Sequence, residues 1–94
     1  MQHVIAEQIL GRELDKNEVV HHLDENPKNN KLINLIVLMR KYHGKLHFYL
    51  RNRSLLIEDY EKIKIQDSLD WLNKNNIMYI KLWNINKDNK KANT

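Results

Sequence analysis

Histidines are concentrated in one short part of this chain. The chain has five histidines in 94 residues, and four of them form two pairs, His21-His22 and His43 with His47. Neutral imidazole binds transition metals, and it is also the side chain that titrates nearest physiological pH. A fold that brings the two pairs together would therefore combine metal ligands with a base.

The sequence around these pairs predicts a strand, a loop, a second strand and a helix. β-Branched residues lead into the first pair and predict a strand over Glu18–Leu23, with a second strand over Leu32–Leu38. Residues 24–31 between them are rich in turn formers. Apolar residues at helical spacing predict a helix over Met39–Leu50, from which the second histidine pair would project on one face.

Further elements are expected on both sides of this unit. His3–Leu10 has helical spacing and is followed by Gly11, where a helix C-cap is expected. Asp67 is a plausible N-cap, and residues 86–94, mostly Asn and Lys, predict a frayed tail. The other expected elements are helices over Ser54–Ile65 and Asp67–Asn75 and a strand over Ile77–Ile85.

The size and composition of the chain predict one domain. Ninety-four residues can form a small core, but not a catalytic domain plus an independent recognition domain. The longest apolar run, Leu35–Met39, is far too short to span a bilayer, and the amino terminus lacks the pattern of a secretory signal. We therefore expect no membrane association and a cytoplasmic location.

The absence of cysteine narrows the possible chemistry. With no cysteine, the chain has no disulfides, no thiol catalysis and no cysteine-ligated zinc. Any bound metal must sit on His, Asp, Glu or Asn side chains. The spacing His-Gly-Lys-Leu-His at residues 43–47 also lacks the glutamate of the His-Glu-x-x-His zinc proteases, which disfavours peptide hydrolysis.

Basic residues surround the histidines. The net charge is +4, and residues 26–53 contain seven Lys or Arg residues and no Asp or Glu. Such a stretch suits a polyanion whose phosphates come close to a metal, although a solvated basic face is the simpler explanation. Together with the histidines, the charge favours DNA as the partner.

Four sequence blocks stand in a fixed order: Glu18–Asn26, Asn29-Asn30, Asn34-Leu35 and His43–His47. Together they resemble the HNH endonuclease family. The segment before them, Ile5–Leu14, is similar to the lead-in helix and Gly-Arg turn of small phage-type members, so the resemblance covers roughly residues 3–50.

The resemblance implies an α+β fold with a ββα-metal core, also called a His-Me finger. The core would span about residues 17–50 of a single domain, with flanking helices. A helical and strand extension over about residues 54–85, with a possible C-terminal strand, and a disordered tail over about 86–94 would follow.

The resemblance also implies a role for each site residue. His21 would be a metal ligand, at a position that is often Asp in relatives, and His22 would be the general base. Asn34 would orient His22 through a side-chain hydrogen bond. His43 would be the second metal ligand and His47 a candidate third. A nitrogen-rich ligand set makes zinc, nickel or manganese as plausible as magnesium, which prefers oxygen.

Several neighbouring residues have simpler explanations. Asn29 and Asn30 are expected to be turn formers, and Asp24 to organise the loop rather than bind metal. Gly44, which is unfavourable inside a helix, allows close approach by DNA or is a tolerated imperfection. His3 is left out of the site.

These features and the resemblance predict a metal-dependent endonuclease that hydrolyses DNA phosphodiester bonds with one divalent ion and a histidine base. The alternative is a zinc-stabilised DNA-binding module without turnover, and a third possibility is a metal-free helical adaptor. With no room for a separate recognition domain, target specificity would come from residues 54–94, from a second copy of the chain or from another partner. By resemblance only, that partner would be a phage packaging or mobile-element protein.

Overall fold

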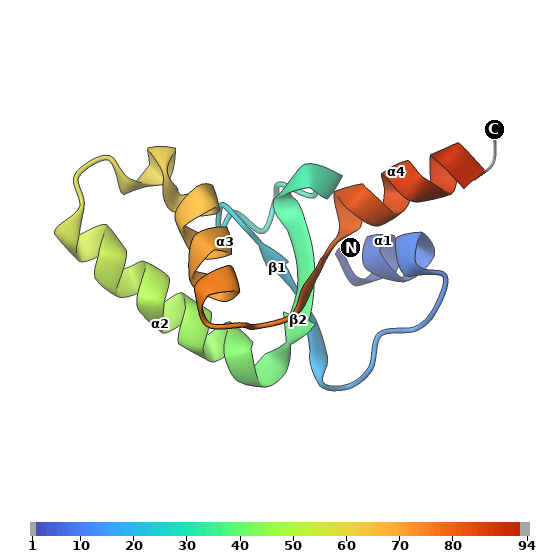
Figure 1. The fold of residues 1–94 in the computed structure, drawn as a ribbon, viewed down its shortest axis with the longest axis horizontal. Coiled ribbons are helices and arrows are strands. Elements are labelled where there is room, and N and C mark those ends of the chain that lie inside the picture. The colour runs from blue at the N-terminus through green and yellow to red at the C-terminus, as the bar shows by residue number, and fades with distance from the viewer. Residues whose placement is uncertain (1, 93–94) are drawn as a thin grey trace.

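A three-stranded antiparallel sheet with the order β1-β2-β3 organises the fold. The computed structural model describes residues 2–92, with side chains to residue 87 (Figure 1). Strands β1 (Glu18–His22) and β2 (Leu35–Met39) pair along their full lengths, with Val20 opposite Val37. The short β3 (Tyr79–Lys81) pairs with the other side of β2. Strand β1 is therefore an edge strand, open on the side away from β2.

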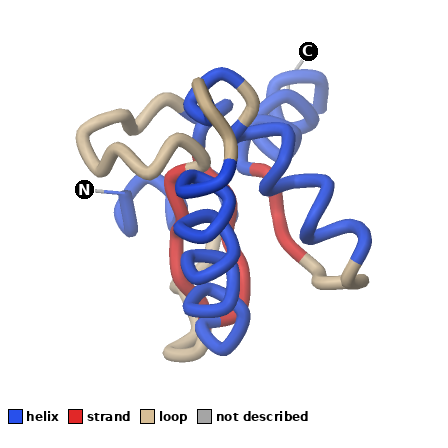
Figure 2. Tube along the Cα trace, turned by 90° about the vertical axis from the view of Figure 1, so that its left-hand side faces the viewer, coloured by secondary structure: helices blue, strands red, loops and turns tan. Residues whose placement is uncertain are grey.

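Helices cover both faces of the sheet. Helices α2 (Arg40–Leu56) and α3 (Lys64–Lys74) lie on one side, and α1 (Gln2–Leu10) and α4 (Leu82–Ala92) on the other (Figure 1). Figure 2, turned so that the α2 side faces the viewer, shows this long helix in front of the strands. The described part of the chain thus forms three layers, helix–sheet–helix, of the α+β class.

Alternation along the strands divides the core in two. Val19 and Leu38 are buried against α2 and α3, whereas Val20 and Val37 are buried with residues of α1 and α4. This follows from the period of two in strands, which sends successive side chains to opposite faces. The same alternation decides where the histidines at the end of β1 point.

The amino-terminal predictions are confirmed. Helix α1 ends before Gly11, whose φ of +72° is the left-handed conformation of a C-cap, and whose N–H donates to the Glu7 carbonyl at 2.9 Å. Arg12 then forms a bidentate pair with Glu18 at the start of β1, at 2.7 and 3.0 Å. The Gly-Arg turn is thereby fixed to the sheet.

The predicted bounds around β2 and α2 need correction. Residues 32–34 form a 3₁₀ turn, η1 (Leu32–Asn34), before β2 begins. Helix α2 continues six residues beyond Leu50, to Leu56, so Ser54–Ile65 is not one helix. It includes the end of α2, a bend with Asp59 at φ +57°, and a second 3₁₀ turn, η2 (Tyr60–Lys62).

The predicted N-cap role of Asp67 is wrong. Helix α3 begins at Lys64, and Asp67 lies in its first turn with no capping bond. Its carboxylate instead accepts hydrogen bonds from Tyr49, Arg53 and Tyr60 at 2.6–3.0 Å. These bonds join α3 to α2 and η2, a tertiary role that leaves the carboxylate no part in capping.

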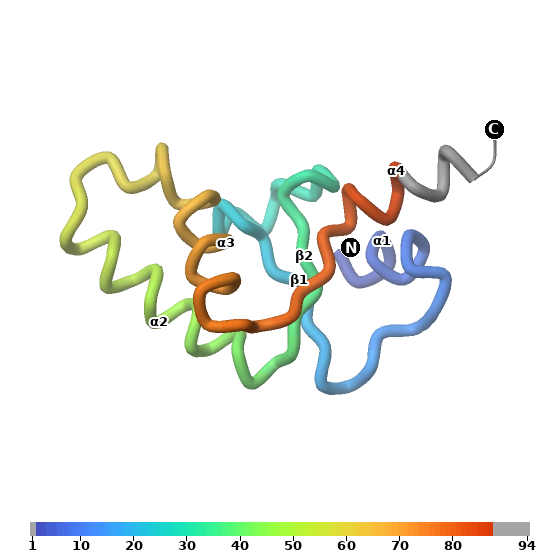
Figure 3. The backbone as a smooth tube through the Cα atoms, viewed as in Figure 1, coloured from blue at the N-terminus to red at the C-terminus, as the bar shows by residue number. Residues whose placement is uncertain are grey.

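The carboxyl-terminal predictions hold only in part. The expected strand over Ile77–Ile85 is limited to β3, because Leu82 is fully buried and starts α4. Of the expected tail, residues 86–92 continue α4, while residues 93 and 94 lie outside the described residues. In Figure 3 the chain runs from α3 through β3 into α4. Helix α4 lies beside α1. None of the described helices has the length and apolar character needed to cross a membrane.

Candidate metal centre and active site

Three histidine side chains meet between β1 and α2. His43 Nε2 lies 3.2 Å from His21 Nδ1 and 2.8 Å from His47 Nε2. The ring centroids are 4.4–5.1 Å apart. We call these three residues the histidine cluster, and within the described residues they could hold a metal ion.

The local structure explains why these three side chains converge. His21 is two residues beyond Val19, so strand alternation turns it toward α2. His43 and His47 are four residues apart and share the face of α2 that meets β1. The spacing of His43 and His47 predicted that they share one helix face, and the resemblance predicted that His21 joins them; the structure brings the three side chains together.

The donor set fits a divalent ion. Ligand nitrogens 2.0–2.1 Å from a tetrahedral ion lie about 3.3–3.4 Å apart. The 3.2 Å separation of His21 Nδ1 from His43 Nε2 is close to this value, and the 2.8 Å separation of His43 Nε2 from His47 Nε2 is shorter. His21 is 2% exposed, and its Nε2 is a buried polar atom without a hydrogen-bond partner in the described part of the chain. That nitrogen is not the one that lies 3.2 Å from His43, so the fit to an ion rests on the convergence of the imidazole nitrogens of the three residues.

Burial also keeps His21 and His43 in the form that binds metal. Burial, reinforced by the neighbouring His43 and His47, lowers the pKa of His21 to about 3. Burial likewise lowers the pKa of His43, with further contributions from His47 and Arg40. Ligating histidine must be neutral, so protons compete little with an ion at His21 and His43 near neutral pH.

A carboxylate that the sequence analysis did not single out supports the cluster. Glu25 Oε2 accepts the Nδ1 proton of His47 at 3.1 Å, which leaves the Nε2 lone pair of His47 free to face the cluster. Glu25 Oε1 pairs at 3.0 Å with Lys64, whose side chain is only 8% exposed. Such a carboxylate beside a metal-binding histidine fixes the tautomer and the ring orientation.

Glu25 reaches this position through an unusual backbone. Its φ is +62°, in the left-handed region that non-glycine residues rarely adopt, and its N–H donates to the His22 carbonyl at 2.9 Å. A sequence signal was available, since Glu25 is the last acidic residue before the acid-free stretch over residues 26–53. Its contact with His47, 22 residues away, depends on the fold.

The partner of His22 differs from the predicted one. We expected the side chain of Asn34 to bond His22, but the structure places Asn30 Oδ1 2.9 Å from His22 Nε2. An amide oxygen only accepts, so His22 carries its proton on Nε2 and leaves Nδ1 as the proton acceptor. Asn30 is thus more than a turn former.

Asn34 instead holds the loop that carries Asn30. Its side chain accepts from the Asp24 N–H at 3.0 Å and donates to Asp24 Oδ1 and to the Asn29 carbonyl, both at 2.9 Å. Asp24 in turn accepts from the Asn29 side chain at 2.8 Å. The expected role of Asp24 as loop organiser is confirmed, and Asn34, 2% exposed, acts on His22 only through this loop.

An open pocket brings both members of the first pair to one space. Strand alternation points His21 and His22 to opposite faces, but β1 is the edge strand and both residues line the pocket at its end. The pocket has a volume of about 290 Å³. Its lining comes from the histidine cluster, His22, Glu25, Gln2, Val20 and Pro27. Space for water and a phosphate therefore adjoins both the cluster and the candidate base.

Comparison with known proteins identifies a family that matches part of the chain. The chain matches the model of the HNH endonuclease family over residues 1–45, a little under half of its length. Neither the curated proteins nor the solved structures contain a significant match. The matched segment includes His21, His22 and His43 but ends before His47, whose place in the cluster rests on geometry. The match confirms the resemblance predicted from the motifs: residues 1–45 of this chain are similar to the HNH endonuclease family.

Proposed function

We propose that this chain is a metal-dependent endonuclease that hydrolyses DNA phosphodiester bonds, with β1, β2 and α2 as its ββα-metal core. The observation that carries the proposal is the convergence of three histidine nitrogens beside His22, whose Nδ1 is left as a proton acceptor. The family match and the acid-free basic stretch over residues 26–53 support DNA as the substrate.

His22 acts as the general base in this proposal. Its Nδ1 takes a proton from a water molecule in the pocket, and the water oxygen attacks the phosphorus in line. The bond from phosphorus to the 3′ oxygen breaks, and that oxygen leaves as a hydroxyl after taking up a proton from solvent. A divalent ion held by His21, His43 and His47 would supply charge stabilisation for the phosphate and the leaving oxygen.

The number of protein ligands favours catalysis over a purely structural metal. Structural zinc sites usually have four protein ligands, whereas catalytic zinc keeps three and an open position. In residues 2–92 the cluster offers three histidines, and it opens onto a pocket. A zinc-stabilised module without turnover remains the alternative, and magnesium, manganese, nickel and zinc are all candidates for the ion.

Nicking of supercoiled plasmid tests the proposal. Wild-type protein should nick DNA with at least one of Mg²⁺, Mn²⁺, Ni²⁺ and Zn²⁺. His22→Ala should lower the rate by about 10² to 10⁴, the usual contribution of a general base. His3→Ala is the matched control, because His3 is exposed and lies outside the site. Undiminished nicking by His22→Ala would refute the assignment, and binding without nicking under every metal would favour the non-catalytic module.

A further inference from the structure

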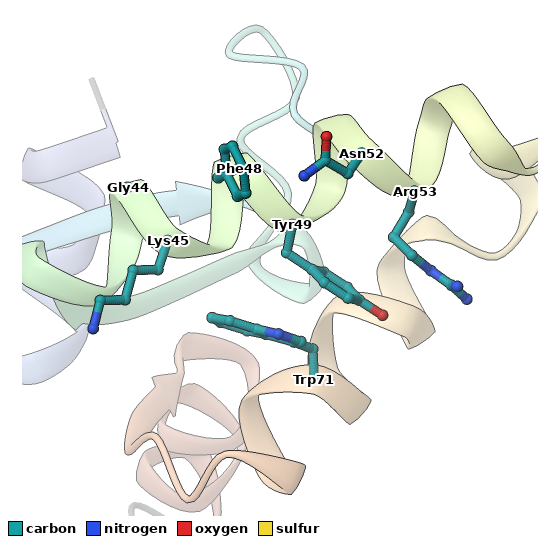
Figure 4. A pocket seen from close by; sticks show the side chains of 7 residues that line it. All are labelled: Gly44, Lys45, Phe48, Tyr49, Asn52, Arg53 and Trp71. Carbon is teal, nitrogen blue, oxygen red and sulfur yellow. The ribbon is translucent and has the colours of Figure 1, made fainter.

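A groove between α2 and α3 is not used by the proposed chemistry. Its volume is about 480 Å³, and α2 supplies most of its wall while Trp71 of α3 closes the far side (Figure 4). The residues that line it are Gly44, Lys45, Phe48, Tyr49, Asn52, Arg53 and Trp71. The same helix carries His43 and His47, but at about 100° per residue the groove-lining side chains lie on another face of α2, so the groove is reached from the metal centre by passing round this helix.

Aromatic rings dominate the groove. Tyr49 and Trp71 lie against each other in Figure 4. Their rings stack with centroids 5.3 Å apart and an interplanar angle of 23°. Phe48 projects from the next position of α2 and is 70% exposed, a large apolar surface left in water. Flat aromatic surfaces of this kind accept a nucleobase, because every base has a π face.

Gly44 leaves one wall of the groove open. Glycine inside a helix is unfavourable relative to alanine, yet a Cβ built on Gly44 would meet no atom within 4 Å. Packing within the described chain therefore gives no reason for the missing side chain. Gly44 lines the groove, so its lack of a side chain keeps that wall open for close approach.

Charge and hydrogen-bonding groups suit a nucleic acid better than a protein. Lys45 is exposed at one end, and the exposed Asn52 side chain makes no hydrogen bond among the described residues, so its amide is available to the edge of a base. Asp67 lies beside Tyr49, but its carboxylate is already held by Arg53 and Tyr60. A polyanion therefore meets no unpaired carboxylate in the lining of the groove.

We propose that this groove binds one unpaired base of the DNA strand whose phosphate lies at the histidine cluster. The inference rests on the proposed function and narrows its substrate class to DNA with an unpaired base near the scissile bond, such as a gap, flap or bulge. The base stacks against Phe48 and the Tyr49–Trp71 pair, and Lys45 contacts a neighbouring phosphate.

Binding of single-stranded oligonucleotide tests the proposal without cleavage. The full chain carrying His22→Ala is used with metal present, and the probe is compared with an abasic strand of the same length and charge. Phe48→Ala should weaken binding of the normal strand about 5- to 140-fold, the loss of one stacked base, with no change in the salt slope. Leu55→Ala is the matched control, since Leu55 is 78% exposed on the same helix outside the groove.

Gly44→Ala separates loss of binding from loss of fold. The substitution should raise Tm by about 4–8 °C through helix propensity, yet weaken oligonucleotide binding, because the new methyl group narrows the groove.

Tryptophan fluorescence reports the stacking directly. In a Trp83→Phe background, where Trp71 is the remaining tryptophan, the normal strand should quench the fluorescence of Trp71 and the abasic strand should not.

The outcomes distinguish this proposal from the nuclease proposal. Plasmid nicking by wild type together with unchanged oligonucleotide binding by Phe48→Ala and Gly44→Ala would overturn the groove assignment alone. Loss of base-dependent binding in these variants, with no nicking by wild type, would support the groove and overturn the nuclease. A change from dimer to monomer in Phe48→Ala with unchanged DNA affinity would instead assign the groove to a contact between copies, and overturn the base site.

Discussion

Glu25 connects the histidine cluster to α3, and its replacement measures how far the metal centre depends on that connection. One carboxylate oxygen lies 3.1 Å from His47 Nδ1, and the other 3.0 Å from Lys64 Nζ. Glu25→Gln keeps the size of the side chain and an oxygen that can accept the Nδ1 proton, but it removes the negative charge. The substitution therefore tests the charge rather than the shape of the partner.

The expected loss is mainly one of metal affinity. Removing such a partner of a ligating histidine typically weakens metal binding about 10- to 100-fold, equivalent to about 1.4–2.8 kcal/mol. Lys64 keeps its pair with Glu61 at 2.7 Å, so its ammonium group is not left without a partner. We therefore expect the metal-free protein to lose no more than about 1 kcal/mol of unfolding free energy, the value of a partly exposed ion pair.

Calorimetric titration of metal-free protein with Zn²⁺ or Ni²⁺ provides the assay, and urea unfolding reports stability. Glu61→Gln is the matched control, because it removes the other partner of Lys64 at a position 76% exposed and outside the contacts of His47. It should leave the metal affinity unchanged. Equal metal affinities in Glu25→Gln and wild type, or equal losses of affinity in Glu25→Gln and Glu61→Gln, would show that the charge of Glu25 does not support the metal site.

Two further predictions concern stability. The hydrogen bond from the Arg12 guanidinium is the largest cause that lowers the pKa of Glu18, to about 2. Because this pKa is lower in the folded protein than in the unfolded chain, the ion pair stabilises the fold fully above about pH 4.5. This stabilisation is lost as the pH falls toward 2. Glu18→Gln should remove this part of the acid dependence of Tm, and an unchanged pH profile would contradict it. Tyr60→Phe deletes the 2.6 Å bond to Asp67 and should cost about 1.5–3 kcal/mol in urea unfolding. Tyr79→Phe, which loses only an exposed hydroxyl bond, should cost clearly less; equal losses would count against the Asp67 network.

The convergence of the cluster could be predicted from sequence because it depends on local periodicity. Strand alternation places His21 on the side of the sheet that α2 covers. The spacing of four residues places His43 and His47 on one side of α2, which faces β1. Strand β1 pairs antiparallel with β2, and β2 leads directly into α2, so the position of α2 against β1 is closely restricted. The two periodicities and this short connection are therefore enough to bring the three histidines together.

The partners of the candidate site could not be predicted in this way. Asn30 and Glu25 lie in the loop between β1 and β2, whose path is fixed by hydrogen bonds among Asp24, Asn29 and Asn34. Turn propensity predicts a loop there, but not which amide faces His22. Such contacts depend on the path of the whole loop. Residue type alone therefore predicts Asn30 only as a turn former and predicts no role for Glu25.

The start of α4 shows a similar limit. Alternation among Ile, Tyr and Trp residues favoured a strand to Ile85, but Leu82 and Ile85 are also three residues apart, which suits a helix. Burial of Leu82 beside Ala6 decides between the two patterns. That contact joins opposite ends of the described chain and is invisible to a local reading.

Metal dependence of DNA nicking distinguishes a metal-dependent nuclease from the alternatives. Protein freed of metal by chelation is returned to supercoiled plasmid with Mg²⁺, Mn²⁺, Ni²⁺ or Zn²⁺ over a range of concentrations. The histidine cluster predicts no nicking by the metal-free protein, recovery of activity with at least one ion, and weaker recovery when His43 is replaced by Ala. Nicking that is undiminished by chelation, or absent with every ion, would contradict a metal-dependent nuclease.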